Sequence, residues 1–162
     1  MDTKLRAFLP ADYHQLITWI DSDELNYLWG GPAFSFPLTS AQLRAHYDNP
    51  DIHAFMFVVD QVNAGYIELY QESLNSFRIC RVFVATDFRG QKLSAVLLNQ
   101  LIEKAQSEFH ATSLSLAVFS HNHVAKCCYQ SLGFRTTAIK QGIRHYQGKA
   151  WDLEIMQKNT LK

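Results

Sequence analysis

The chain has 162 residues with 15 basic and 15 acidic side chains, and hydrophobic residues make up 48% of it. This length suits one domain with a sizeable core, and the hydrophobic content argues against disorder. The balanced charge argues against a nucleic-acid-binding protein with a general basic surface, and no apolar run approaches the ~20 residues that cross a bilayer.

The cysteines predict a reducing environment rather than a disulfide-bonded fold. There are 3 of them, an odd number, and a bridge between the adjacent Cys127 and Cys128 would be strained. No signal peptide precedes Leu5. We therefore expect one cytoplasmic domain over residues 1–162, with no membrane or nucleic-acid partner.

The first half of the chain is expected to alternate short strands and helices. Its expected elements are a strand at Lys4–Phe8, a helix from Pro10 to Ile20, an irregular aromatic segment at 21–37, a helix from Thr39 to Tyr47, and antiparallel strands at Phe55–Asp60, Gly65–Tyr70 and Ser76–Ala85. Residues 61–64 form the expected turn between the first two of these antiparallel strands. Pro10 suits a first helical position, and Thr39 suits an N-cap.

The second half predicts a crossover between parallel strands. Its expected elements are a helix that begins near Gln91, a strand at Ser113–Phe119, a helix from Asn122 to Gly133, and strands at Phe134–Lys140 and Ala150–Met156 that are joined near residues 145–148. The long helix between two strands is consistent with a βαβ crossover.

The turn from Arg89 to Ser94 joins an expected buried strand to an amphipathic helix. A helix that begins near Gln91 directs unpaired backbone N–H groups and the positive end of its dipole into this turn. Arg89 and Lys92 add two full positive charges. The turn predicts an anion site that suits a pyrophosphate, although an ordinary strand-to-helix connection with two solvated cations fits the same residues.

The helix after Asn122 carries a polar stripe. Asn122 and Tyr129 lie on nearly the same helix face, about 10 Å apart along the axis. Ala125 stands between them and is too small to block a ligand. For this pattern alone, a tyrosine that packs against the sheet is the other interpretation.

Together, the Arg89 turn and the Asn122 helix resemble the cofactor-binding core of the GNAT superfamily of N-acetyltransferases, and the order of the elements is similar to the order in that superfamily. The resemblance implies an α/β (α+β) fold with a mixed, mostly antiparallel sheet of about seven strands, helices on both faces, and a splay between the fourth and fifth strands. Lys92 departs from the usual motif, in which glycine is common. A lysine fits there if its backbone is already helical.

The resemblance also implies an activity, which is transfer of the acetyl group of acetyl-CoA to a primary amine by direct attack in a ternary complex, without a metal. The residues that it assigns to acetyl-CoA are Val82, Phe83, Val84, Arg89, Gly90, Gln91, Lys92, Leu93, Ser94, Ala95 and Asn122. Tyr129 stands at the position of the family's general acid. A backbone N–H near Val84 would stabilise the developing oxyanion.

The general base is open at this level. Glu68 is the first candidate, and His121 or His53 are alternatives. The other interpretation of Glu68 is an outward-facing carboxylate on a strand. His121 and His123 do not predict a metal site, because no third ligand stands at a recognisable spacing.

The acceptor and the assembly state are also open. The segment Trp29–Pro32 resembles the branch that acts on ribosomal-protein N-termini and small amines, so the acceptor is a small molecule or a peptide amine. A peptide α-amine, a polyamine, an amino acid and an aminoglycoside fit equally well, as do a monomer and a homodimer. The alternative function is a catalytically weak CoA-binding sensor or assembly module. Lys92 favours it, as does Ala117, where some family members carry a glutamate.

Overall fold

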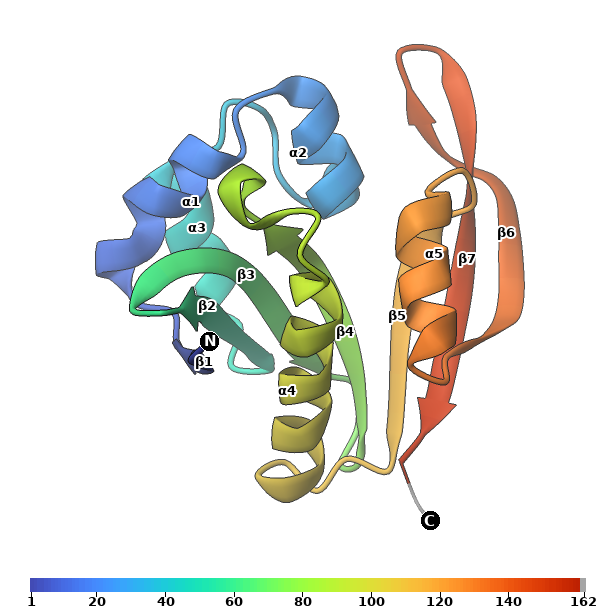
Figure 1. Cartoon of the computed structure of the whole chain (residues 1–162). Coiled ribbons are helices and arrows are strands. Elements are labelled where there is room, and N and C mark those ends of the chain that lie inside the picture. The colour runs from blue at the N-terminus through green and yellow to red at the C-terminus, as the bar shows by residue number, and fades with distance from the viewer. Residues whose placement is uncertain (161–162) are drawn as a thin grey trace.

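Seven strands form one mixed sheet in the computed structural model, which describes residues 1–160 (Figure 1). The strands are β1 (Thr3–Ala7), β2 (Ile52–Val59), β3 (Val62–Gln71), β4 (Ser76–Val84), β5 (Ser113–Phe119), β6 (Arg135–Tyr146) and β7 (Lys149–Asn159). Their order across the sheet is β1-β2-β3-β4-β5-β7-β6, and within the described residues only β4 and β5 pair in parallel. This arrangement confirms the mixed, mostly antiparallel sheet expected from the sequence.

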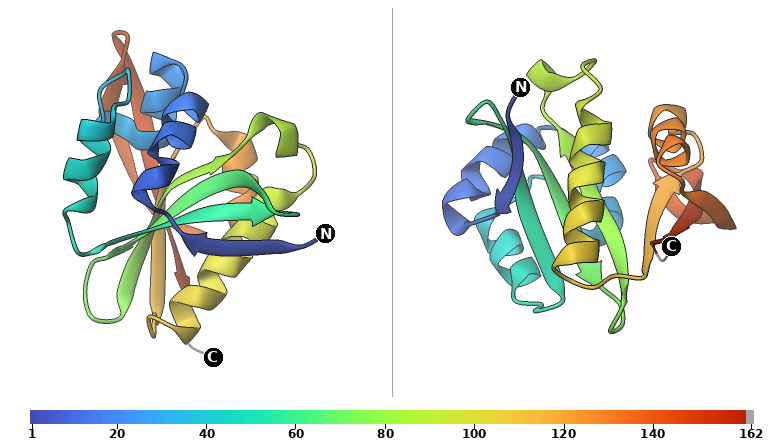
Figure 2. Two further views of the ribbon diagram at one scale, coloured as in Figure 1. Left: turned by 90° about the vertical axis from the view of Figure 1, so that its left-hand side faces the viewer. Right: turned by 60° about the horizontal axis from the view of Figure 1, so that its bottom comes forward.

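Helices cover both faces of the sheet, as predicted. The helices are α1 (Tyr13–Trp19), α2 (Asp23–Gly30), α3 (Ser40–Tyr47), α4 (Leu93–Ser107) and α5 (His123–Ser131). Figure 2 shows α3 and α4 on opposite sides of the strands. Leu16 of α1 and Leu43 of α3 belong to one buried core with Tyr66 of β3, whereas Leu97 and Leu101 of α4 belong to the other.

The sheet opens between its fourth and fifth strands. β4 pairs with β5 only from Ser76 to Ile79, opposite Ser113 to Leu116. Beyond Ile79 the two strands diverge, and Figure 1 shows the gap between them. The predicted splay is therefore confirmed. Along the rest of β4, backbone groups on the β5 side are available to a ligand.

A β-bulge lies in β4 at the start of this gap. Cys80 pairs with Glu68 and Phe83 pairs with Tyr66, so two residues of β4 stand opposite the single residue Ile67. Arg81 is one of the two and has a left-handed backbone with a φ of 53°. A bulge bends its strand and increases the local twist, which directs the end of β4 away from β5.

The aromatic segment expected to be irregular contains a helix, so that expectation was wrong. The Ser22 side chain accepts a hydrogen bond from the Leu25 backbone N–H at 3.1 Å, as a favoured N-cap does. Asp23 and Glu24 complement the positive end of the helix dipole in the first turn. The many aromatic and glycine residues of this segment indicated an irregular structure, so these capping residues did not lead to a predicted helix.

Both hairpins are longer and tighter than predicted. β2 and β3 are joined at Asp60 and Gln61, which have φ angles of 48° and 69°. β6 and β7 are joined at Gln147 and Gly148, with φ angles of 49° and 77°. Two residues with positive φ make the turn that best matches the twist of antiparallel strands. The predicted turns were wider because neither pair is a strong turn dipeptide.

Candidate active site

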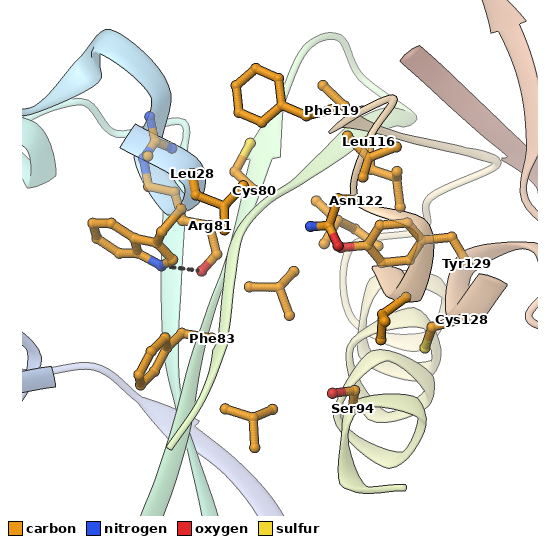
Figure 3. A pocket seen from close by; sticks show the side chains of 18 of the residues that line it. Leu28, Cys80, Arg81, Phe83, Ser94, Leu116, Phe119, Asn122, Cys128 and Tyr129 are labelled. Carbon is orange, nitrogen blue, oxygen red and sulfur yellow. Dashed lines mark hydrogen bonds between the residues drawn. The ribbon is translucent and has the colours of Figure 1, made fainter. Parts of the chain in front are cut away.

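A cavity of about 830 Å³ occupies the gap between β4 and β5 (Figure 3). It is lined by residues from α2, β4, the turn before α4, β5, α5 and the β6–β7 hairpin. The cofactor residues and the acid expected from the sequence that line it are Val82, Phe83, Val84, Arg89, Gly90, Lys92, Leu93, Ser94, Ala95, Asn122 and Tyr129. Two expected site residues, Gln91 and Glu68, do not line it.

The turn before α4 combines positive charges with free helix-end amides. α4 begins at Leu93, two residues later than expected, because Lys92 is not helical. The N–H groups of the first helical turn have no partner within the helix, and Leu93, Ser94 and Ala95 line the cavity. Helix-end amides with nearby cations form an anion site. Gln91 instead donates its side-chain amide to the Asp87 carbonyl at 3.2 Å.

Lys92 occupies the left-handed region, with φ 61° and ψ 21°. The condition under which a lysine was expected to fit, a helical backbone, is therefore not met. The chain keeps the conformation for which glycine is preferred, and a residue with a Cβ adopts it at a cost of roughly 1–2 kcal/mol. The exposed ammonium stands beside the helix end.

Arg89 is fixed to the end of β4. Its Nε donates to the Val84 carbonyl oxygen at 2.9 Å, and its guanidinium lies over the Phe83 ring at 5.4 Å. The terminal nitrogens of the guanidinium make no hydrogen bond within the described residues. They remain available to an anion at the mouth of α4.

The backbone N–H of Val84 points into the gap. Ala85 N–H donates to Ala64 on the β3 side at 2.7 Å. Backbone groups of successive residues in a strand point to opposite sides, so Val84 directs its N–H and carbonyl away from β3. The pairing with β5 ends at Ile79, which leaves the Val84 N–H free to meet a ligand.

Tyr129 projects from α5 into the same cavity (Figure 3). Asn122 caps α5 by accepting from the Ala125 N–H at 3.3 Å, and Gly133 follows the helix with a φ of 95°, so both predicted helix-end signals are confirmed. Burial raises the pKa of the Tyr129 phenol above its usual value. The hydroxyl therefore stays protonated at neutral pH and can donate a proton or a hydrogen bond.

A partly buried ion pair anchors α5 to the sheet. Lys126 Nζ lies 2.8 Å from Glu154 on β7, and the Thr136 hydroxyl donates to the same carboxylate at 3.0 Å. The hydrogen bond from Lys126 lowers the pKa of Glu154. This contact fixes the helix that carries Tyr129 against the outer half of the sheet.

Glu68 is buried within a polar cluster rather than facing outward. Its side chain is 1% exposed, and it pairs with Arg81 Nη1 at 3.0 Å and with His46 Nε2 at 3.0 Å. The Tyr66 hydroxyl also donates to Glu68, and Tyr47 contacts the Tyr66 hydroxyl in turn. The cluster therefore joins α3, β3 and the bulge of β4.

Trp29 of α2 completes the support of the bulge. Its indole Nε1 donates to the Arg81 carbonyl oxygen at 2.9 Å, a bond drawn in Figure 3. Arg81 is thus held by its backbone through Trp29 and by its guanidinium through Glu68. These two contacts stabilise the strained backbone from which the gap-facing part of β4 begins.

None of the three candidate bases lines the cavity within the described residues. Glu68 pairs with Arg81, and Arg81 lines the cavity. His121 stacks on Phe119, which does line the cavity, with ring centroids 5.8 Å apart. His53 packs on Phe109 at 4.7 Å, and burial lowers the pKa of its imidazole.

Sequence reasoning did not identify one whole wall of the cavity. Leu25 and Leu28 of α2 face it, together with Arg144 of β6 and Leu153 of β7. α2 was not predicted, because the aromatic and glycine residues of this segment indicate an irregular structure. Arg144 lies in a hairpin whose docking against α2 depends on contacts over more than a hundred residues of chain.

Within residues 1–160, no helix has both the length and the apolar character that a membrane crossing requires. In the same part of the chain, no group of three or more His, Cys, Asp or Glu side chains is arranged to hold a metal ion.

Residues 15–134 match the acetyltransferase (GNAT) family, and the chain belongs to this family. The match confirms the family and the enzyme class that the two motifs predicted. An uncharacterized N-acetyltransferase, YdgE of Bacillus subtilis (strain 168), is 33% identical over 79 residues, which are 47% of this chain. The match spans about half the length of that relative, 50%.

Solved structures share the fold over nearly the whole chain. A spermidine N-acetyltransferase from Vibrio cholerae in complex with CoA and spermine has a TM-score of 0.85 at 18% identity, covering 97% of this chain and 95% of that one. A putative phosphinothricin N-acetyltransferase has a TM-score of 0.84 at 17% identity, with coverages of 99% and 100%. YncA, a putative acetyltransferase from Salmonella typhimurium with acetyl-CoA, has a TM-score of 0.78 at 18% identity, with coverages of 100% and 96%.

Proposed function

We propose that the protein transfers the acetyl group of acetyl-CoA to a primary amine, and that the amine attacks the thioester directly in a ternary complex. The observation that carries this proposal is a single cavity between the diverging strands, with the anion site of α4 at one end and the α2–hairpin wall at the other. Both reactants can therefore reach one point, next to Val84 and Tyr129. Solved neighbours with CoA or acetyl-CoA support the choice of cofactor.

The cofactor binds through its diphosphate and its pantetheine arm. The first-turn amides of α4, with Arg89 and Lys92, hold the diphosphate. The pantetheine amides then pair with the gap-facing backbone of Val82 and Val84, as an added strand would. This brings the thioester carbonyl to the same stretch of β4, where a gap-facing backbone N–H near Val84 stabilises the negative charge that develops on the carbonyl oxygen.

Tyr129 acts on the departing thiolate. An ordinary phenol titrates near 10 and a thiol near 8.5, and burial increases this difference by raising the pKa of Tyr129. Complete proton transfer before the carbon–sulfur bond breaks is therefore unfavourable. The role that fits is a hydrogen bond that strengthens as charge develops on sulfur, with the proton transferred late.

Water carries the proton of the attacking amine in this proposal. The ionisable side chains that line the cavity, within the described residues, are arginines, Lys92, Tyr129, Cys80 and Cys128. Burial raises the pKa of Cys80 to about 11, so its thiol is a poor base at neutral pH. A base acting from outside the lining, such as Glu68, stays a prediction that a variant can test.

Two measurements test the proposal. Acetyl-CoA titrated into the protein should give a saturable binding isotherm below ~1 mM, the limit that corresponds to about −4 kcal/mol. A panel of primary amines should then release free thiol from acetyl-CoA above the rate without acceptor. Absence of binding would exclude the cofactor, whereas binding without thiol release for any amine would favour the CoA-binding module instead.

A further inference from the structure

The end of the cavity farther from α4 has apolar walls and one arginine without a carboxylate partner within the described residues. Leu25 and Leu28 of α2 face Phe119 of β5 and Leu153 of β7, and Figure 3 shows Leu28 and Phe119 on this side of the gap. Arg144 of β6 lines the same end. Such walls suit an apolar side chain of the acceptor, and a guanidinium among them suits an anionic group.

Arg144 carries the uncompensated charge at this end. Two other arginines of the lining are neutralised, since Arg78 pairs with Glu72 at 2.7 Å and Arg81 pairs with Glu68 at 3.0 Å. Arg144 is half-buried, and within residues 1–160 its guanidinium has no carboxylate at ion-pair distance. Its recorded contact is the carbonyl of the neighbouring residue at 3.5 Å.

Contacts of the two residues that follow Arg144 hold its strand at the cavity. The His145 N–H donates to the Tyr27 hydroxyl at 3.0 Å, and the Tyr146 hydroxyl donates to Asp23 at 3.3 Å. The rings of Tyr27 and Tyr146 also pack 5.2 Å apart. The hairpin is thereby docked on α2, so a guanidinium on this strand is preorganised.

The charge of the lining opposes a polyamine. Its charged side chains within the described residues are cationic, and the acidic Asp23 and Glu24 on the first turn of α2 do not line it. A spermidine molecule would bring several ammonium groups to this surface without a carboxylate to receive them. Like charges in a confined site repel, and their desolvation is uncompensated.

We propose that the acceptor is an apolar α-amino acid whose carboxylate pairs with Arg144 and whose side chain contacts Leu28 and Phe119. The planar guanidinium suits a bidentate carboxylate contact. With the carboxylate so held, the α-amine faces the thioester near Val84. This inference rests on the proposed acetyl transfer and assigns its substrate class and a specificity-determining residue.

The test compares matched ligands in wild type, Arg144→Gln and Arg135→Gln. The ligands are leucine, methionine and phenylalanine, the carboxamide of each, and spermidine. Arg135 is an exposed arginine on the same strand and serves as the matched control. Binding to the CoA-saturated protein is measured by calorimetry, and turnover is measured by thiol release.

We expect at least one of the three amino acids to bind the wild type about tenfold or more tightly than its carboxamide and than spermidine. Arg144→Gln should abolish this preference and leave the affinity for acetyl-CoA within about twofold, because Arg144 belongs to the β6–β7 hairpin and not to the α4 turn. Arg135→Gln should change neither. The carboxamide has an amine that titrates near 8, as a peptide α-amine does, so a preference for the acid does not reflect a larger supply of free amine.

Tighter binding of spermidine or of the carboxamides would overturn the inference, as would an Arg144→Gln variant that keeps the preference. Equilibrium binding separates this outcome from failure of the proposed function. Binding of the amino acids through Arg144 without release of thiol would support the proposed binding site and contradict the proposed reaction. Acetylation of other amines only would support the proposed reaction and contradict the assigned substrate class.

Discussion

At the scale of single residues, the two side chains that matter most to the cofactor are under opposing demands. Lys92 adopts a backbone conformation that suits glycine, yet its ammonium adds charge beside the anion site. Tyr129 is partly buried, and this burial raises the pKa of its phenol, yet it must support the departure of a thiolate. In the free protein the backbone of Lys92 is strained and the phenol of Tyr129 is desolvated. Each side chain makes its functional contact only when the ligand is bound.

The strain at Lys92 should appear as a stability difference. Lys92→Gly removes the Cβ from a left-handed residue, so the free energy of unfolding should rise by about 0.5–1 kcal/mol after the greater entropy of unfolded glycine is counted. Lys92→Met keeps the Cβ and should leave stability unchanged within about 0.5 kcal/mol. Urea denaturation of both variants measures the difference. A Lys92→Gly protein less stable than Lys92→Met would contradict a strained backbone.

Tyr129→Phe should lower kcat by about 10- to 100-fold and leave the affinity for acetyl-CoA nearly unchanged, because only the departing sulfur uses the hydroxyl. Because the pKa of Tyr129 is raised above its ordinary value near 10, the wild-type phenol stays protonated below that pH. Its deprotonation should therefore cause no loss of kcat between pH 7 and about 10. A fall of kcat over this range that disappears in Tyr129→Phe would show that the phenol titrates earlier.

At the scale of elements, the shape of β4 depends on neighbours from both sides. The bulge at Arg81 is supported by α2 through the Trp29 indole and by β3 and α3 through Glu68. None of these contacts touches the cofactor in our proposal. They determine the direction in which the backbone of Val84 points, so they act on binding through geometry.

Trp29→Phe removes the donor to the Arg81 carbonyl and keeps most of the aromatic packing. We expect a loss of about 1–2 kcal/mol in stability, because a buried carbonyl loses its partner. The Kd for acetyl-CoA should rise by about 5- to 10-fold as the gap-facing backbone relaxes. Calorimetric titration below the unfolding temperature measures the second effect. Trp19→Phe, at an indole that makes no hydrogen bond within residues 1–160, is the control and should leave the Kd unchanged.

Glu68→Gln distinguishes a general base from a support of the bulge. Removing one charge of a buried pair leaves Arg81 uncompensated, so stability should fall by about 3–5 kcal/mol and the Kd for acetyl-CoA should rise. A base role instead predicts an unchanged Kd, a lower kcat and the loss of an acidic limb from the pH–rate profile. Tyr47→Phe, at the outer edge of the cluster, should preserve both binding and rate. Each outcome assigns Glu68 to one role.

At the scale of the whole molecule, two halves of the sheet meet through a short parallel pairing. β1 to β4 form one half and β5 to β7 the other, and four residues of each inner strand join them. The halves carry different parts of the proposed site, with the backbone of Val84 on one and Tyr129 on the other. A ligand in the gap adds contacts to both halves at once.

Acetyl-CoA should therefore protect backbone amides on both sides of the gap from hydrogen exchange. At a concentration of about 100 times its Kd it should also raise stability by ~2.7 kcal/mol. A CoA fragment without pantetheine, 3′-phospho-ADP, should protect the first turn of α4 but not Val84 of β4 or Ala117 of β5. Equal protection by the fragment and the whole cofactor would place the pantetheine arm outside the gap.

Local interactions allowed the ends of helices, the Arg89 turn and the order of the elements to be predicted from the sequence. Asn122 and Gly133 mark the ends of α5 because capping and left-handed termination depend on one residue and its immediate neighbours. The Arg89 turn, the apolar face of α4 and the order of the strands were predictable for the same reason. These local signals were sufficient for the family and the enzyme class.

Only the tertiary structure decided the rest, because the remaining features depend on contacts between distant segments. Glu68 is indistinguishable in sequence from an exposed strand carboxylate, and its burial follows from Arg81 and His46 on other elements. Arg144 lines the cavity because Tyr27 and Asp23 bind the β6–β7 hairpin to α2. Hydrophobic periodicity and capping specify elements within a few turns of chain, whereas the position of a charge in a cavity depends on how the whole fold packs.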